Sequence, residues 1–488
     1  MTAPSLDPLR RRFILGPRLH PAFNDATHVR LRTGGLVLQA HPDLDVTHDT
    51  NDAGVSATLL GFALDPRTPR ATNADVLNRL LQETTCAADA HRVTHFWGGR
   101  WVLVVEDASG ARLFADPCGF RQAFYTDAAH NERWCATHPG LLSDVMPLTE
   151  APNAREGFIE TGAYQNRPEW VWPYDTALYQ GVRRLLPNHF LDLTTGHAHR
   201  FWPTTPRREA PLVDVVTAVA PLLRGLMEGM AHRAPLAVAV TAGLDSRLVL
   251  AAARSVADRA WFHTQQYWAH TARTPDMYLP PRLCAHLGLA HHIVDCPADM
   301  TPAFAAQYHA HTHDAHPAYG VIAEGLHRHL PAGHVLVKGN GAEIARGRQV
   351  KVERPSIEDL ARITVHASHH PFTEHHTARW LKEVRPVAAR TGYAIPSLHY
   401  WEHRMGSWQA QAQTEWDLVC ESFTPFNCRA VLVHLLATPV PVQEETQGHF
   451  YRLIDTLWPE ALALPVNPTP LREKIRATLR TVWRRVRA

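Results

Sequence analysis

The chain has 488 residues, of which 45% are hydrophobic and 20% are charged, and its formal net charge is +2. These values describe a globular protein of two or three domains, and the near-neutral charge argues against nucleic-acid binding as its main role. No apolar run approaches the roughly 18–20 residues that cross a bilayer, and the first residues lack the apolar core of a signal peptide. We therefore expect a cytoplasmic protein without a membrane span.

Cysteine and lysine, two residues often used in catalysis, are present in small numbers. Seven cysteines are scattered without any Cys-x-x-Cys pair, so we interpret them as free thiols in a reducing compartment rather than as disulfides or zinc ligands. Lysine is rare, which narrows the search for a catalytic lysine. The four lysines are Lys338, Lys351, Lys382 and Lys474.

Residues 1–205 are predicted to be rich in β-structure. Apolar strands at 98–107 and 111–116, joined by the turn Ser109-Gly110, indicate a hairpin. A linker is expected at 206–211. An amphipathic helix over 212–230 follows it.

The apolar run Leu236–Val240 is typical of a buried parallel strand, and it is followed by the small-residue turn Thr241–Ser246 and an alanine-rich helix. Small side chains let a phosphate approach the backbone, and the first N–H groups of a helix favour negative charge. Asp245 would repel a phosphate, so we expect a divalent cation between them. The alternative is a plain turn between a strand and a helix.

Two further strands are predicted at 260–267 and 291–295, with a helix over 274–289 between them. This alternation predicts a doubly wound parallel sheet, in which ligands bind at the carboxyl ends of the strands. A fourth strand near Val335–Val337 runs into the glycine turn Gly339–Gly341.

Histidines cluster between Tyr308 and His316. His309, His311 and His313 would align on one side of a strand, but zinc-type spacing is missing, so we favour surface or substrate-facing histidines over a metal site. Near the other end, 471–487 is predicted to be a basic amphipathic helix able to contact a membrane, a nucleic acid or a partner protein.

Two segments resemble known families. The turn Thr241–Ser246 resembles the Ser-Gly-Gly-Xaa-Asp-Ser pyrophosphate loop of ATP pyrophosphatases, with Thr and Ala in place of the first Ser and Gly. The run Asp116–Arg121 with Tyr125, followed by matches at 179–193 and 200–202, resembles the N-terminal domain of class II glutamine amidotransferases. Together they resemble the asparagine synthetase-like family, which includes β-lactam synthetase and the lasso-peptide cyclases.

The resemblance implies a fold and a division of the chain. Residues 1–205 would form an α+β, β-rich, Ntn-hydrolase-like glutaminase domain, and residues 206–488 an α/β doubly wound ATP pyrophosphatase domain. The family's glutaminase nucleophile is an N-terminal cysteine, whereas Thr2 stands here. We therefore expect a domain that does not hydrolyse glutamine.

The resemblance also implies ATP and Mg²⁺ as cofactors. Asp245 and Glu343 would hold the metal ion, Asn340 would face the substrate, and Lys474 would stabilise charge during catalysis. Ile344 replaces a family carboxylate and Lys338 a family serine. The expected nucleotide-binding residues are Val240, Thr241, Ala242, Gly243, Leu244, Asp245, Ser246, Gly339 and Gly341.

The predicted function is that of an ATP-dependent, AMP-forming amide ligase that adenylates a carboxylate and couples it to an amine without glutamine hydrolysis. The substrate would be a small molecule or a peptide carrying both groups, which gives an amide, lactam or macrolactam, with a precursor peptide or partner protein as a further partner. Two alternatives stay open: an ammonia-dependent asparagine synthetase, and a non-catalytic nucleotide-binding relative.

Overall fold

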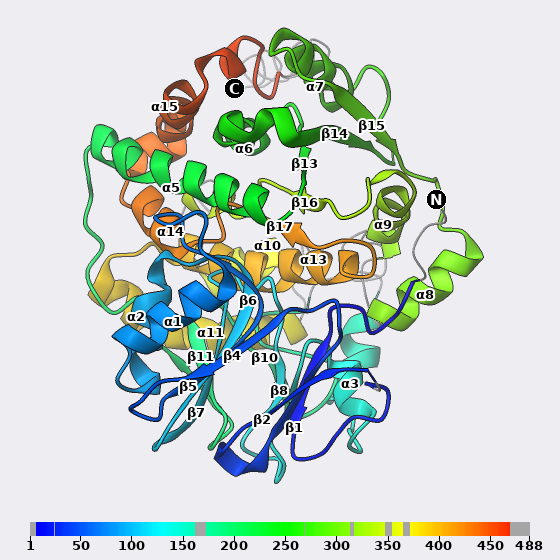
Figure 1. Cartoon of the computed structure of the whole chain (residues 1–488), viewed down its shortest axis with the longest axis vertical. Coiled ribbons are helices and arrows are strands. Elements are labelled where there is room, and N and C mark those ends of the chain that lie inside the picture. Colours follow the sequence, from blue (N-terminus) through cyan, green and yellow to red (C-terminus); the bar gives the residue numbers. More distant parts are fainter. Residues whose placement is uncertain are drawn as a thin grey trace, which may run out of the picture.

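The structure, a computed structural model, describes residues 6–23, 25–161, 172–268, 270–312, 317–346, 354–364 and 371–468. Two six-stranded antiparallel sheets are built from the first part of the chain, and a five-stranded parallel sheet from the second. Figure 1 shows the antiparallel sheets at the bottom and the parallel sheet with its helices above them. The predicted combination of a β-rich part and a parallel α/β part is confirmed.

The two antiparallel sheets stack on each other. The first has the order β10-β8-β9-β1-β3-β2 and the second the order β12-β11-β7-β6-β5-β4. The strands of the first are β1 (Phe13–Gly16), β2 (Thr27–Arg30), β3 (Val37–Ala40), β8 (Phe124–Thr126), β9 (Cys135–Ala136) and β10 (Val182–Arg184). Those of the second are β4 (Val46–Thr50), β5 (Ser56–Leu64), β6 (Gly98–Asp107), β7 (Gly110–Ala115), β11 (His189–Asp192) and β12 (His197–Arg200).

Side chains that alternate along the strands create the layers. Val104 of β6 packs with Leu15 of β1 in the core between the sheets, whereas its neighbour Leu103 belongs to the core on the other face. Helix α1 (Asn73–Glu83) contributes to that outer core, and α3 (Pro139–Ser143) to the core outside the first sheet. The β-rich part therefore has four layers, in the order helix, sheet, sheet, helix.

The parallel sheet has the order β15-β14-β13-β16-β17, and all its neighbouring strands are parallel. Its strands are β13 (Leu236–Ala239), β14 (Ala260–Gln266), β15 (His291–Asp295), β16 (Val335–Val337) and β17 (Ser422–Phe423). The predicted strands at 236–240, 260–267 and 291–295 are confirmed to within a residue. Parallel pairing follows because helices connect the strands and bring the chain back to the same end of the sheet.

Helices cover both faces of this sheet, as expected for a doubly wound fold. One core contains residues of α5 (Leu212–Arg233), α6 (Leu244–Ala252), α7 (Pro275–His286), α14 (Arg429–Leu436) and α15 (Gly448–Leu457). A second core contains residues of α8 (Pro302–Thr312), α9 (Pro317–His329) and α13 (Ala410–Trp416).

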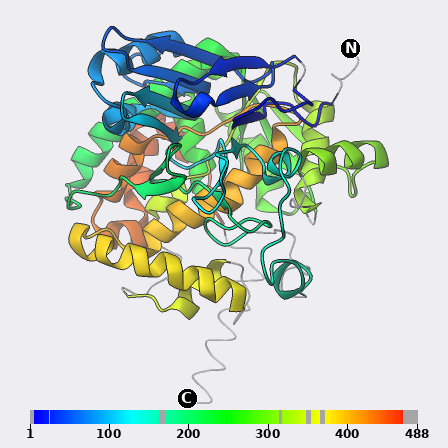
Figure 2. The same ribbon diagram turned by 90° about the horizontal axis from the view of Figure 1, so that it is seen from below.

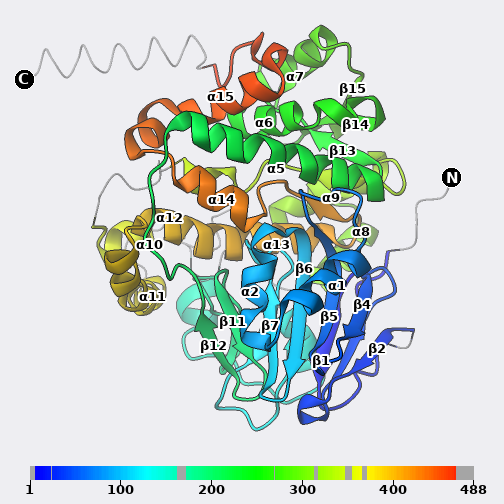
Figure 3. The same ribbon diagram turned by 60° about the vertical axis from the view of Figure 1, so that its left-hand side comes forward.

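The remaining helices lie between the two sheet systems or at their side. They are α2 (Ala90–Val93), α10 (Ile357–Thr364), α11 (Pro371–Thr391) and α12 (Ile395–His399), which continues into a π-helical stretch at Tyr400–Gln409. Figures 2 and 3 show α11 on the outside of the molecule beside the β-rich part. Of the described residues, no helix is both long and apolar enough to span a membrane.

Buried polar contacts join the β-rich part to the parallel-sheet part. The backbone turn that begins at Asp116 is fixed by Asn427, whose amide nitrogen donates to the Asp116 carboxylate at 2.8 Å and whose side-chain oxygen accepts from Cys118 N at 2.8 Å. Arg100 of β6 reaches Asp417 beside α13. These contacts bury an interface between the two parts. The predicted domain boundary between residues 205 and 206 stays a prediction.

Candidate functional site

Two loops meet where the strand order of the parallel sheet reverses. From β13 the chain proceeds to β14 on one side, whereas β16 pairs with β13 on the other side. Ligands of open parallel sheets bind outside the carboxyl ends of the strands at this position. The turn Thr241–Ser246 follows β13, and the turn Lys338–Gly341 follows β16. The sheet thus brings together two loops that are far apart in sequence.

The first loop is closed by its own hydroxyl groups. Thr241 Oγ1 and Ser246 Oγ lie 2.7 Å apart, and Gly243 N donates to Thr241 Oγ1 at 3.0 Å. Helix α6 starts at Leu244, and its first backbone bond runs from Arg247 N to Gly243 O at 3.2 Å. The N–H groups of residues 244–246 precede that bond, so they are the donors that a helix N-terminus offers to an anion.

Distant residues hold the same loop from outside. Ala242 N donates to Asp276 Oδ1 in the first turn of α7 at 2.7 Å, and Asn467 N donates to Ala242 O at 2.9 Å. Arg247 is buried and donates to the carbonyl oxygens of Ala461 at 2.7 Å and Leu464 at 3.0 Å. Sequence reasoning missed these supports. The available signal for Asp276 was an acidic residue opening a predicted helix at the carboxyl edge of the sheet.

The second loop needs its glycines for close approach. A Cβ on Gly339 would lie 3.0 Å from the carbonyl carbon of Asp245 and 3.1 Å from Ser246 N. Gly341 has a φ of +96°, which L-residues with side chains rarely adopt. Thr424, just after β17, fixes the turn by donating its hydroxyl to Asn340 O at 3.1 Å. Backbone packs directly on backbone where the two loops touch.

Asp245 and Glu343 form a carboxylate pair in this site. Burial, together with the charge of Glu343, raises the pKa of Asp245 to about 8. Asp245 Oδ2 pairs with Arg346 Nη2 at 3.0 Å, while its buried Oδ1 has no hydrogen-bond partner among the described residues. A divalent cation would neutralise both carboxylates and fill the orphaned oxygen, so the residues fit such an ion. Arg346 was not predicted from the sequence.

The described residues contain no group of three or more His, Cys, Asp or Glu side chains able to hold a metal ion. Mg²⁺ is usually bound by one or two carboxylates together with substrate phosphates. The pair Asp245 and Glu343 would therefore act jointly with a nucleotide.

The two predicted catalytic residues have different outcomes. Asn340 lies at the centre of the second loop, and its side-chain oxygen is buried without a hydrogen-bond partner in the described part of the chain. Lys474 lies outside the described residues and stays a prediction. Lys338, at the end of β16, places Nζ 3.8 Å from the ring centroid of Trp416, and burial lowers its pKa to about 7.

The histidine cluster proves to be partly structural. His311 is buried in α8, and its ring nitrogens lie 2.7 Å from Pro8 O and 2.9 Å from Thr414 O. The favoured interpretation as surface histidines is wrong for His311, which is buried, and because the segment is helical His309 and His311 point to different sides. His313 and His316 lie outside the described residues.

Six of the seven cysteine thiols are poorly suited to nucleophilic attack. An activated thiol has a lowered pKa, yet Cys118, within the amidotransferase-like segment, is fully buried and its thiol pKa lies well above the usual value. Burial likewise raises the thiol pKa of Cys135, Cys284, Cys296, Cys420 and Cys428.

No family model and no curated protein matches the chain. Among solved structures, weak similarity is found to an allosteric regulatory enzyme of purine biosynthesis, with 10% identity and a TM-score of 0.25 over 55% of this chain and 62% of that chain, so the chain spans less than two thirds of it. A glutamine phosphoribosylpyrophosphate amidotransferase from B. subtilis complexed with ADP and GMP has 8% identity and a TM-score of 0.25 over 70% and 72% of the two chains. A glutamine-dependent NAD+ synthetase from Acinetobacter baumannii complexed with ADP has 12% identity and a TM-score of 0.20 over 62% and 61%. TM-scores this low do not define a shared fold.

Proposed function

We propose that this chain is an ATP-dependent, AMP-forming amide ligase of the asparagine synthetase-like type. The observation that carries the proposal is the meeting of two glycine loops at the reversal of strand order, where Gly339 packs against the backbone of Asp245 and Ser246. Helix α6 directs its first amides into this place, and a carboxylate pair lies beside them. Phosphate groups and a divalent cation together satisfy this combination.

The proposed reaction has two steps. A substrate carboxylate oxygen attacks the α-phosphorus of ATP, and pyrophosphate leaves. An amine then attacks the activated carbonyl, AMP leaves and an amide forms. Residues 240–246 hold the pyrophosphate, with Gly339 and Gly341 as the opposing wall. Asn340 faces the substrate, and Lys474 stabilises charge that develops on the reacting groups.

Asp245 and Glu343 would hold Mg²⁺ when the nucleotide is bound, and the ion would neutralise negative charge on the phosphates. Burial, and after it the negative charge of Glu343, raises the pKa of Asp245, so a cation beside the two carboxylates would be stabilising. Arg346 supplies the compensating positive charge in the structure described here.

We propose that the amine belongs to the substrate itself. Burial raises the thiol pKa of six of the seven cysteines, which disfavours each of these six as the nucleophile of glutamine hydrolysis. A substrate carrying both a carboxylate and an amine, either a small molecule or a peptide, would yield a lactam or macrolactam.

The first test measures pyrophosphate release from ATP with a pool of amino carboxylates and short peptides. Asp245→Asn should lower turnover roughly 100-fold, because the variant loses the charge that positions the cation beside the phosphates. Asp258→Asn, at an exposed position away from the loops, is the matched control and should keep full activity. Unchanged turnover in Asp245→Asn would contradict the mechanism.

One observation favours a second candidate, a nucleotide-binding protein without ligase activity. The ion pair from Arg346 to Asp245 occupies the carboxylate that the metal ion would use. Calorimetry with ATP and Mg²⁺ separates the two candidates when combined with the turnover assay. Binding without pyrophosphate release indicates the non-catalytic protein, and a separate arm with aspartate and ammonium detects ammonia-dependent asparagine synthesis.

A further inference from the structure

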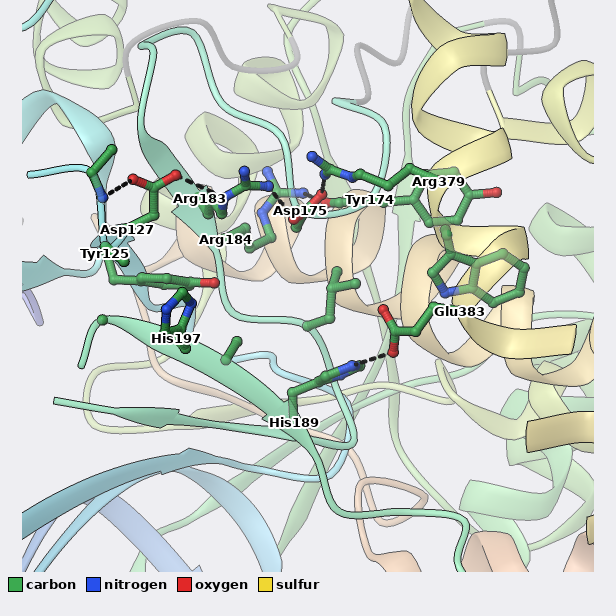
Figure 4. Close-up of a pocket in the computed structure, with 16 residues that line it drawn as sticks. Tyr125, Asp127, Tyr174, Asp175, Arg183, Arg184, His189, His197, Arg379 and Glu383 are labelled. Atoms are coloured by element: carbon green, nitrogen blue, oxygen red, sulfur yellow. Dashed lines mark hydrogen bonds and ion pairs between the residues drawn. The ribbon is translucent and has the colours of Figure 1, made fainter. Parts of the chain in front are cut away.

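A cavity lies between the β-rich part and helix α11, and the proposed ligase mechanism makes no use of it. Its volume is about 370 Å³, within the range of small-molecule sites, and its walls come from β8, β10, β11, β12 and α11. Figure 4 shows the lining side chains converging on this space. In Figures 1 and 3, α11 and α6 lie in different regions of the molecule, so the cavity is distinct from the loop at Thr241–Ser246.

One side of the cavity is formed by two guanidinium groups on a shared carboxylate. Arg183 donates through Nε to Asp127 and through Nη1 to Asp175, each at 3.0 Å, and Arg379 donates through Nη2 to Asp175. A guanidinium carries five N–H donors in a planar fork that matches a carboxylate. The described contacts therefore leave donors on both arginines, and each side chain keeps more than a third of its surface exposed.

A buried phenol faces the same space from β8. Tyr125 is only 3% exposed, and its hydroxyl points into the cavity without a hydrogen-bond partner among the described contacts. Burial, reinforced by the nearby carboxylate of Asp175, raises the pKa of this phenol above its usual value. The hydroxyl therefore stays protonated and is a donor. The hydroxyl opens on the cavity, where an acceptor atom of a ligand would receive its hydrogen bond in place of water.

The three carboxylates that line the cavity, Asp127, Asp175 and Glu383, each pair with a basic side chain. Glu383 Oε1 pairs with His189 Nε2 at 3.1 Å and with Arg200 Nε at 2.8 Å, and these two partners outweigh partial desolvation and lower the pKa of Glu383 to about 2. Tyr174 and Trp380 stack with ring centroids 5.1 Å apart and add a flat apolar wall, together with Leu186. The cavity therefore offers donors at one side and an apolar surface at the other.

We propose that this cavity binds an organic carboxylate with a flat apolar body, which places its carboxylate on Arg183, Arg379 and the Tyr125 hydroxyl and its body against Trp380. Charge-assisted hydrogen bonds from paired arginines give such a group both strength and orientation. The proposal does not depend on the ligase activity, because no residue of the two loops takes part.

The test is calorimetric titration of the full chain with N-acetyl-tyrosine and with N-acetyl-tyrosinamide. The two probes share the ring and differ in the carboxylate, so the acid should bind at least tenfold more tightly than the amide. Arg379→Met, which keeps the apolar stem, should weaken binding of the acid roughly tenfold, and Tyr125→Phe should weaken it about threefold or more. A short peptide ending in tyrosine tells whether a peptide C-terminus or only a free small acid is accepted.

Arg385→Met is the matched control, because Arg385 is an exposed arginine of the same helix that does not line the cavity. It should bind N-acetyl-tyrosine as the natural protein does. Thermal midpoints measured for every variant show that the fold is kept, and Tyr125→Phe, which removes one oxygen, serves if Arg379→Met unfolds. Equal binding of acid and amide, no detectable binding of the acid, or equal affinity in Arg379→Met and Arg385→Met would overturn the proposal.

Discussion

At the scale of single residues, the site depends on positions where a side chain is absent or a charge is unbalanced. Gly339 lets the second loop lie directly on the backbone of Asp245 and Ser246. Asp245 keeps one buried oxygen without a partner and shares its other oxygen with Arg346. A buried oxygen without a partner is unfavourable by itself. Under the proposed function a cation would satisfy this oxygen, which is the pattern expected of a binding residue rather than of a core residue.

Gly339→Ala tests the contact between the loops. The added methyl group would lie 3.0 Å from the Asp245 carbonyl carbon, closer than a normal contact and against backbone that cannot yield cheaply, so ATP affinity should fall roughly tenfold or more. Gly288→Ala is the control, since it meets no atom within 4 Å but has a φ of +71°. That control should lose about 1 kcal/mol of stability and keep its ATP affinity. Equal ATP affinity in both variants, measured by calorimetry, would contradict the assignment of the second loop.

At the scale of elements, β6 of the antiparallel sheet is joined to the segment between α13 and β17 by buried charges. Arg100 Nη1 and Nη2 bind the two oxygens of Asp417 at 2.5 and 2.7 Å, and Glu421 accepts from Arg100 at 2.8 Å and from Arg121 at 2.7 Å. Because these side chains come from segments about 300 positions apart, they fix how the two sheet systems face each other. A buried pair of this kind is costly to break, since the remaining charge is left without compensation.

Asp417→Asn should lower the free energy of unfolding by about 3 kcal/mol, because Arg100 then stays buried without the negative charge of Asp417. Asp43→Asn is the comparison, as Asp43 pairs with Arg10 at 2.6 Å but keeps 43% of its side chain exposed. An exposed pair contributes about 0–1 kcal/mol, so this variant should be nearly neutral. Urea unfolding at neutral pH measures both. A similar loss in both variants would show that burial of the Arg100 pair is unimportant.

At the scale of the whole molecule, buried neutral histidines set the response to acid. His263, His399 and His449 are almost fully buried, and burial lowers their pKa values to about 3, 3 and 4. An unfolded chain has histidine pKa values near 6.5, so it binds more protons than the folded chain at every pH between these limits. The free energy of unfolding therefore falls as the pH falls below about 6.5. Asp245, whose pKa is raised to about 8, has the opposite effect: its contribution to the free energy of unfolding increases as the pH falls.

His399→Gln isolates one of these contributions. Tyr174 Oη lies 3.0 Å from His399 Nδ1, and glutamine can keep a hydrogen bond there without acquiring a charge. Between pH 7 and pH 5.5 the natural protein should lose about 1 kcal/mol more stability than the variant. Urea unfolding curves at the two pH values provide the comparison. An identical pH dependence in the two proteins would mean that His399 is protonated in the folded state or accessible to water.

Local patterns determined much of this molecule. The apolar strand Leu236–Ala239, the glycine turn that follows β16 and the hairpin of β6 and β7 were readable from the sequence, because each depends on neighbours within a few residues. The local pattern also indicated the first loop, whereas the roles of Gly339, Asn340, Gly341 and Glu343 came from the family resemblance. The Tyr308–His316 run misled for the opposite reason: an alternating histidine pattern gave no local sign that α8 would bury His311 against Thr414.

Only the tertiary structure decided which distant residues meet. The contact of Arg346 with Asp245, the contact of Asp276 with Ala242 and the cavity lined by Tyr125 and Arg379 each join segments that no local pattern relates. The sequence by itself determined the elements and the first loop, since short-range propensity and hydrophobic period act along the chain. The packing of sheets and helices decided which residues contact that loop. It also decided which residues line the cavity of Tyr125 and Arg379, because electrostatic and steric contacts act through space.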